Sequence, residues 1–313
     1  MAKKSKRNSP KPNGNRAQRL AERREALERA TAAPARPFEG FAAECDLVAL
    51  REFVPSATTV LPLRDSTLRD STLRDSTLRD STRTVVLGTV LPGAAAGLVR
   101  ESTGYVGLQL QGHTGDPAHD LACAIAWAST ADPEKTLASV RAEDGDPGLA
   151  DVIDPAATLD ITVHNDFAWW IPEGVEPSAE ERAAVQRAES VIRPSARLDG
   201  PTAAWWVDAG EKAYLRWVRP EEEDALMLAL ARVHARGSLT LGEGSRFAGS
   251  FRTLGLLVPV FDLDLERHPN EWVDAVLELD RELVDAIAVD APLTPAERRS
   301  RDGLRGRQVT LRL

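Results

Sequence analysis

Two arginines lie in a glycine-rich segment whose composition suits an anion-binding loop. Arg246 and Arg252 stand within residues 241–255, which contain four glycines. Backbone amides and guanidinium groups can together hold a phosphate or a carboxylate. The named phosphate motifs are absent, because Phe247 occupies the position of the third glycine of a dinucleotide loop and no Lys-Ser or Lys-Thr pair follows. The alternative is a sterically permitted turn into a buried strand at residues 254–263.

Two Trp-Trp pairs could supply an aromatic surface. The first begins at Trp169, in a strand expected over residues 160–171, and the second begins at Trp205, in a strand expected over residues 203–208. Because successive side chains of a strand point to opposite faces, each pair puts one ring on each face. Either both faces are covered, as in a core or a domain interface, or large rings are exposed and can stack on bases or sugars.

These side chains outline one candidate cleft for a small molecule that bears a phosphate or a carboxylate. Such a cleft would make the chain a binding protein or an enzyme. The candidate binding residues are Arg246, Arg252, Trp206, Asp208 and Trp169.

Side chains of metal-ligand type gather at His113, Asp116, His119, Asp120 and Cys123. A histidine and a cysteine four residues apart lie about one helical turn from each other. The spacing matches no standard zinc pattern, and helix capping and core packing already account for Asp116 and Cys123. We therefore predict no metal site, and the sequence indicates no cofactor.

Charge is distributed unevenly along the chain. Residues 1–36 carry 11 Lys or Arg and 3 Glu, residues 297–313 carry 6 Arg against one Glu and one Asp, and the net charge of −9 leaves −21 for the residues between. The first segment is expected to be disordered or helical. It could contact nucleic acid, the ribosome or another polyanion, or it could act as a solubilising tail or lie on the acidic body. The candidate polyanion contacts are Lys3, Lys4, Lys6, Arg7 and Lys11.

The residues between these tails have the pattern of an α+β protein with small antiparallel sheets flanked by helices. Two units are expected, residues 37–150 and residues 151–296, and a similar order of elements suggests a duplication. Asp116 and the proline after it are typical of a helix start. Helices are expected at residues 42–54, 119–129, 179–192, 221–235 and 269–289, and further strands at residues 58–63, 84–92, 105–111, 212–219 and 254–263.

The pentapeptide Leu-Arg-Asp-Ser-Thr occurs four times in succession over residues 63–82. A five-residue period gives no apolar stripe on a helix or a strand. A single coil of a pentapeptide β-helix would have no neighbour to stack on. We therefore expect an inserted loop at the tip of a hairpin between the strands at residues 58–63 and 84–92.

The sequence favours a cytoplasmic protein without a membrane segment. No apolar run reaches about 18 residues, and no apolar stretch follows the basic N-terminus. Cys45 and Cys123 stand singly and are expected to be small core residues. Because no nucleophile elbow or His-Glu-x-x-His occurs, we expect a non-catalytic interaction or scaffold module with protein partners.

Three segments resemble an uncharacterised actinobacterial protein family, a domain of unknown function. They are the run from Arg246 to Leu263, Pro37-Phe-Glu-Gly, and Asp46-Leu-Val-Ala-Leu-Arg-Glu. The resemblance covers about residues 36–290. Members of that family sometimes carry the labels preprotein translocase SecA or topoisomerase II, and the sequence supports neither label. It has no Walker loop, no cysteine-rich tail and no recognisable context for a nucleophilic tyrosine.

Deletion of residues 68–82, three of the four pentapeptides, is expected to leave the melting temperature nearly unchanged. Loop-closure entropy depends only weakly on loop length. The measurement is thermal unfolding of the two proteins side by side. A melting temperature lowered by several degrees would show that the repeats are part of the packed structure.

Overall fold

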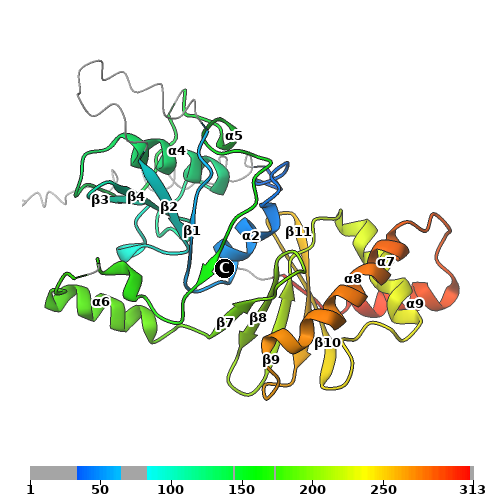
Figure 1. The fold of residues 1–313 in the computed structure, drawn as a ribbon. Coiled ribbons are helices and arrows are strands. Elements are labelled where there is room, and N and C mark those ends of the chain that lie inside the picture. The colour runs from blue at the N-terminus through cyan, green and yellow to red at the C-terminus, as the bar shows by residue number, and fades with distance from the viewer. Residues whose placement is uncertain (1–33, 65–82, 144, 173, 311–313) are drawn as a thin grey trace, which may run out of the picture.

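The computed structural model describes residues 34–64, 83–143, 145–172 and 174–310 (Figure 1). The expected polyanion contacts at the N-terminus and all but the first two residues of the repeat lie outside these ranges. Within them, two six-stranded sheets and seven α-helices form a mixed structure, so the expected α+β class is confirmed.

The first sheet has the strand order β5-β3-β4-β2-β1-β6. Its strands pair antiparallel except for β2 and β4, which run parallel. The antiparallel pairing of β1 with β2 confirms the hairpin that was expected to flank the repeat. The strands are β1 (Ala57–Val60), β2 (Thr84–Gly88), β3 (Gly97–Arg100), β4 (Thr103–Gly107), β5 (Thr136–Leu137) and β6 (Thr162–Val163).

The second sheet has the strand order β12-β10-β11-β9-β8-β7. Here, too, one pair is parallel, β10 with β12, and the others are antiparallel. The strands are β7 (Ser195–Arg197), β8 (Ala204–Asp208), β9 (Ala213–Trp217), β10 (Ser245–Thr253), β11 (Leu256–Leu263) and β12 (Gln308–Thr310).

The two sheets are covered by different helices: α4 packs on the first sheet and α7 packs on the second (Figure 1). Among the described helices, none has the length and apolarity that a membrane span requires. The α-helices are α2 (Glu44–Glu52), α4 (Pro117–Thr130), α5 (Leu149–Val152), α6 (Ala179–Glu189), α7 (Glu223–Ala235), α8 (Val273–Ile287) and α9 (Pro295–Arg305), and the short 3-10 helices are η1 (Pro92–Ala94), η2 (Ala168–Trp170) and η3 (Pro269–Trp272).

Several helices begin at a side-chain cap. The Asp116 carboxylate accepts hydrogen bonds from the backbone N–H groups of Ala118 and His119, which confirms the expected start of α4. Ser178 and Thr294 begin α6 and α9 in the same manner, each within a capping box. These caps satisfy N–H groups that have no acceptor inside the helix.

The second sheet is buried on both faces. Trp205 lies in a core shared with α2, α4 and the first sheet, whereas Trp206 lies in a core shared with α7 and α8. Their exposed fractions are 0% and 9%. Along β11, Val258 belongs to the first core and Leu257 to the second. The alternation that a strand imposes therefore divides the protein into two cores, one on each side of this sheet.

Arginine–carboxylate pairs tie α2 to the second sheet and to α7. Arg197 of β7 donates from Nε and Nη2 to the two carboxylate oxygens of Asp46, at 2.9 and 3.0 Å. Arg36 donates to Glu44 at 2.7 and 3.0 Å and to Glu222 at 2.6 Å. Bidentate pairs of this kind add geometric specificity to a contact between elements.

Two local expectations are wrong. Residues 160–171 do not form one strand, because Asp166 accepts a hydrogen bond from the N–H of Ala168 and starts the turn that becomes η2. Residues 245–253 are not a glycine loop but the strand β10, paired with β11 along its length. Strand β3, which lies between two pairing partners, was not expected at all.

The expected division into two duplicated units stays a prediction. Residues after 150 contribute β6 to the first sheet, and α5 spans the expected boundary. The central pairings of the two sheets differ, since β2 and β4 are parallel and β9 and β11 are antiparallel.

The substitution Trp205→Ala is expected to lower the free energy of unfolding by about 3–5 kcal/mol, because the removed ring is fully buried. Val60→Ala is the control, since Val60 is 62% exposed and its loss is expected to stay within about 0.5 kcal/mol. Urea denaturation of both variants measures the difference. Equal losses would contradict the two-core description.

Candidate functional site

The two candidate anion-binding arginines lie near opposite ends of β10, and each contacts a carboxylate. Arg246 Nη2 lies 2.5 Å from Asp262 Oδ2 on the neighbouring strand. Arg252 pairs with Glu223 at the start of α7. The backbone between them is engaged in the β10–β11 pairing, so the structure does not bring the two guanidinium groups together around one ligand.

An open cavity of about 520 Å³ lies beside Arg246. Two of the lining residues are cationic, Lys212 and Arg246, and both contact Asp262. Hydrogen bonds from these two residues outweigh the effect of partial burial and hold the pKa of Asp262 below its ordinary value. The lining is acidic on balance, which opposes the binding of an anionic ligand. The lining residues are Glu211, Lys212, Gly244, Ser245, Arg246, Asp262, Leu263, Asp264, Leu265 and Glu266.

The other candidate cleft residues are spread over the fold. Trp206 is in the core, and Asp208 at the end of β8 accepts a hydrogen bond from the N–H of Gly210 in the following turn, at 2.7 Å. Strands β9 and β11 separate β8 from β10 and hence from Arg246.

Trp169 packs against the first sheet. Its Nε1 donates to Ser56 Oγ at 2.9 Å, and its ring stacks on His164 with centroids 5.9 Å apart. A Cβ atom placed on Gly88 would lie only 2.6 Å from the ring. The glycine therefore makes room for the indole at the end of β2.

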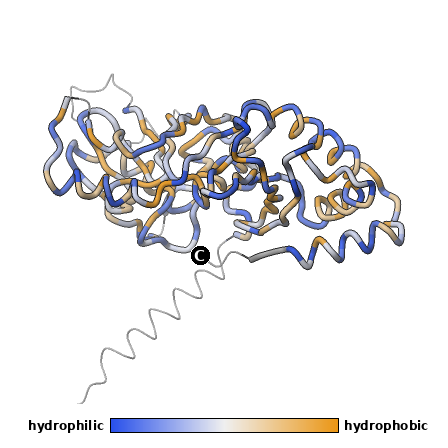
Figure 2. The backbone as a smooth tube through the Cα atoms, turned by 90° about the horizontal axis from the view of Figure 1, so that it is seen from below, coloured by the Kyte–Doolittle hydropathy of each residue, from blue (hydrophilic) through white to orange (hydrophobic). Residues whose placement is uncertain are grey.

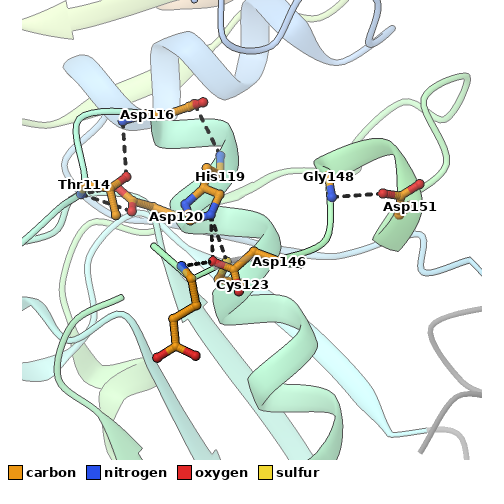
Figure 3. Close-up of polar contacts among 9 residues, drawn as sticks. Thr114, Asp116, His119, Asp120, Cys123, Asp146, Gly148 and Asp151 are labelled. Carbon is orange, nitrogen blue, oxygen red and sulfur yellow. Dashed lines mark hydrogen bonds and ion pairs between the residues drawn. The ribbon is translucent and has the colours of Figure 1, made fainter. Parts of the chain in front are cut away.

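A group of three side chains that could perform chemistry lies at the start of α4 (Figure 3). His119 Nε2 is 3.0 Å from Asp146 Oδ2 and 3.5 Å from Cys123 Sγ. The three donor atoms lie within 4.8 Å of one another, and all three side chains are partly buried. We refer to these residues as the His-Cys-Asp cluster.

Local structure positions each member of the cluster. His119 and Cys123 are four residues apart on α4, so both face the same side of the helix. Asp146 lies in a turn, where its Oδ2 also accepts a hydrogen bond from the N–H of Glu143 at 2.7 Å. These contacts direct the carboxylate toward His119 (Figure 3).

The electrostatics of the cluster keep the thiol protonated. Burial, together with the nearby Asp146 carboxylate, raises the pKa of Cys123 to about 12. The pKa of Asp146 lies below its ordinary value. The main cause is the hydrogen bond from the N–H of Glu143, and the contact with His119 lowers the pKa further. At neutral pH a carboxylate and a neutral thiol therefore lie beside the His119 ring.

The geometry differs from that of a nucleophilic triad. In a triad, one imidazole nitrogen contacts the nucleophile and the other contacts the acid. Here Nε2 of His119 contacts both partners, and the buried Nδ1 has no hydrogen-bond partner among the described residues. A protonated thiol is also a poor nucleophile. The cluster is suited to ligation rather than to covalent catalysis.

The sequence placed two of the three cluster residues together and missed the third. The other nearby ligand-type residues have structural roles, because Asp116 caps α4 and Asp120 accepts from the N–H of Thr114. Burial raises the pKa of Asp120. Asp146 comes from a separate turn, and no periodicity links that turn to α4.

The fold and the cluster define an α+β protein with two cores and, among the described residues, one group of three potential ligands. The chain belongs to a family of unknown function: the model of the Family of unknown function (DUF5926) matches residues 37–312. No curated protein and no solved structure matches the chain. The expected membership of a domain family of unknown function is confirmed. Functional roles therefore rest on the geometry of this chain.

Replacement of Gly88 by Ala is expected to destabilise the protein by about 1–3 kcal/mol, because the new Cβ collides with the Trp169 ring. The matched control is Gly303→Ala on α9, where nothing lies within 4 Å, and a small stabilisation of about 0.4–1 kcal/mol is expected. Thermal and urea unfolding report both values. A Gly88→Ala protein as stable as the parent would show that Trp169 moves freely, as a ligand platform would require.

Proposed function

We propose that this chain is a non-catalytic interaction module whose contact surface is an arginine face built on α9, and that its partner is a short acidic segment of another protein. The observation that carries the proposal is the concentration of exposed positive charge on one helix of a chain whose central residues are strongly acidic. The arginine face consists of Arg236, Arg298, Arg299, Arg305 and Arg307, all of them exposed.

The packing of α9 leaves this face outward. On the inner side Leu304 is buried, and Ser300 Oγ lies 3.1 Å from His234 Nδ1 of α7. The exposed Arg298 and Arg305 are seven residues apart, which puts them on the same side of the helix. In Figure 2 the helix that precedes the C-terminal segment is drawn largely as hydrophilic.

Much of this charge remains available to a partner. Arg305 lies 3.5 Å from Asp224, an exposed pair that contributes little to stability. Arg299 and Arg307 make no ion pair within the described part of the chain. Arg305 and Arg307 lie at the C-terminal end of α9, where positive charge interacts favourably with the helix dipole.

The surroundings favour a short protein segment over a long nucleic acid. Helix α8 packs on α7, as α9 does, and it exposes the acidic residues Asp274, Glu278 and Asp285. A long polyanion bound at the arginine face would extend over a chain whose central residues are strongly acidic and would be repelled. A short acidic segment meets the five arginines and few carboxylates, of which Asp302 and Asp224 are exposed there, and the positive balance favours rapid association.

Binding of a short glutamate-rich peptide, followed by fluorescence anisotropy on the full chain, tests the proposal. The double substitution Arg298→Ala with Arg299→Ala is expected to weaken binding about tenfold, and salt raised from about 50 to about 200 mM weakens it further. Arg182→Ala with Arg187→Ala, two exposed arginines of α6, is the matched control and should bind as the parent does.

Three outcomes would overturn the proposal. One is the absence of peptide binding at low salt, and another is an equal loss in the α6 control. The third is a preference for a duplex RNA of equal charge, which would favour the nucleic-acid alternative.

The N-terminal segment carries a separate proposal. Contact with nucleic acid or the ribosome through Lys3, Lys4, Lys6, Arg7 and Lys11 remains an alternative function, and the cytoplasm remains the proposed location. Removal of residues 1–33, which keeps the paired Arg36, would abolish polyanion binding through these residues and leave binding at the arginine face unchanged. Comparison of the full-length and shortened chains therefore separates the two.

A small-molecule ligand at the cavity beside Arg246 is the remaining alternative. The cavity supports it, and the acidic lining opposes it. Thermal stabilisation by millimolar phosphate would favour this alternative if it were lost in both Arg246→Ala and Arg252→Ala. We expect no such stabilisation, because the Arg246 guanidinium group already forms an ion pair with Asp262.

A further inference from the structure

We infer that His119, Cys123 and Asp146 form a binding site for a transition-metal ion of the zinc class. The inference stands on the convergence of three different donor atoms, Nε2, Sγ and a carboxylate oxygen, at one partly buried place. It goes beyond the interaction function and concerns another part of the molecule. It also departs from the expectation drawn from sequence spacing, because Asp146 supplies the third donor.

The distances between the donor atoms approach those of a tetrahedral site. Bond lengths of about 2.0–2.2 Å to nitrogen and oxygen and about 2.3 Å to sulfur would separate nitrogen from oxygen by about 3.4 Å and nitrogen from sulfur by about 3.6 Å. The corresponding distances here are 3.0 Å from His119 to Asp146 and 3.5 Å from His119 to Cys123. Shifts of a few tenths of an ångström would bring these two distances to the tetrahedral values, and the sulfur and oxygen donors lie within 4.8 Å of each other.

Two of the three donors are held by one rigid element. Helix α4 is capped by Asp116, and it buries residues such as Leu121 and Ile125 against the first core. The spacing of His119 and Cys123 directs both side chains to one side of this helix. Donors fixed before the ion arrives lose little conformational freedom on binding.

The donor set selects the kind of ion. One nitrogen, one sulfur and one oxygen donor suit Zn²⁺ or Co²⁺, whereas Mg²⁺ and Ca²⁺ require oxygen ligands. On binding, the S–H bond of Cys123 breaks, a metal–sulfur bond forms, and the proton passes to solvent. The thiolate and the Asp146 carboxylate then balance the two charges of the ion.

The neighbouring ligand-type residues do not compete for the ion. Both carboxylate oxygens of Asp120 accept from the N–H of Thr114 at 3.2 Å, and Asp116 caps the helix. His113 is exposed, and the cluster of donor atoms does not include it. Three protein donors leave a coordination position open to water or to another ligand.

A bound ion would fasten the backbone at Glu143 and Asp146 to α4. The turn contacts the helix through Asp146, at His119 and Cys123. Metal binding that requires the folded arrangement stabilises the folded state by mass action.

Cobalt titration of the full chain, after chelator treatment, tests the inference. We expect one Co²⁺ per chain, with the near-ultraviolet charge-transfer absorption that reports a thiolate ligand, and displacement of Co²⁺ by Zn²⁺. Zn²⁺ is expected to raise the melting temperature by several degrees. Cys123→Ser should remove the charge-transfer absorption and weaken Zn²⁺ binding at least tenfold.

Asp146→Asn provides a second variant on a turn outside the helix, so that a folding defect of the helix variant cannot obscure the result. It should weaken Zn²⁺ binding at least tenfold while the metal-free protein keeps the circular dichroism spectrum of the parent. His113→Ala is the matched control and should bind as the parent does. Absence of binding at one ion per chain, a cobalt spectrum without thiolate absorption, or an equal loss in His113→Ala would each overturn the inference.

Discussion

The burial of one strand on both faces is the constraint on which the rest of the structure depends. Because Trp205 and Trp206 are adjacent on β8, their rings must enter different cores, and each core must be closed by its own set of helices. Helix α2 and the first sheet close one side, and α7 and α8 close the other. Both indole N–H groups lack an acceptor among the described residues, as is consistent with rings that serve as apolar packing.

The polar contacts at the seam between the cores follow from this arrangement. Closing the first core brings α2 against the second sheet, and the acidic residues at the start of α2 then meet arginines from distant parts of the chain. Asp46 pairs with Arg197, and Glu44 pairs with Arg36. Charges that would be costly to bury alone are paired where the two cores meet. Arg36 and Arg197 therefore serve structure, whereas the exposed arginines of α9 do not take part in this seam.

Sequence patterns predicted the elements that local chemistry determines. The capped start of α4 at Asp116, the helix expected within residues 269–289 and the strand with Trp205 follow from caps and periodicity, and all are confirmed. Strand β10 escaped prediction because its glycines resemble a loop, and Gly249 in fact accompanies a bulge beside the backbone of Arg307. The sequence indicated only two members of the His-Cys-Asp cluster. His119 and Cys123 share one helix, whereas Asp146 reaches them only through tertiary folding.

The edges of both sheets are short. In the first sheet the outer strands β5 and β6 have two residues each, and in the second the outer strands β7 and β12 have three each. Such edges offer too few unpaired N–H and C=O groups to template a further strand. Extension of the first sheet by another chain is therefore disfavoured, which opposes edge-to-edge aggregation there. In the second sheet β12 pairs only with residues 250–252 of β10, so the short edge strand covers part of its longer neighbour.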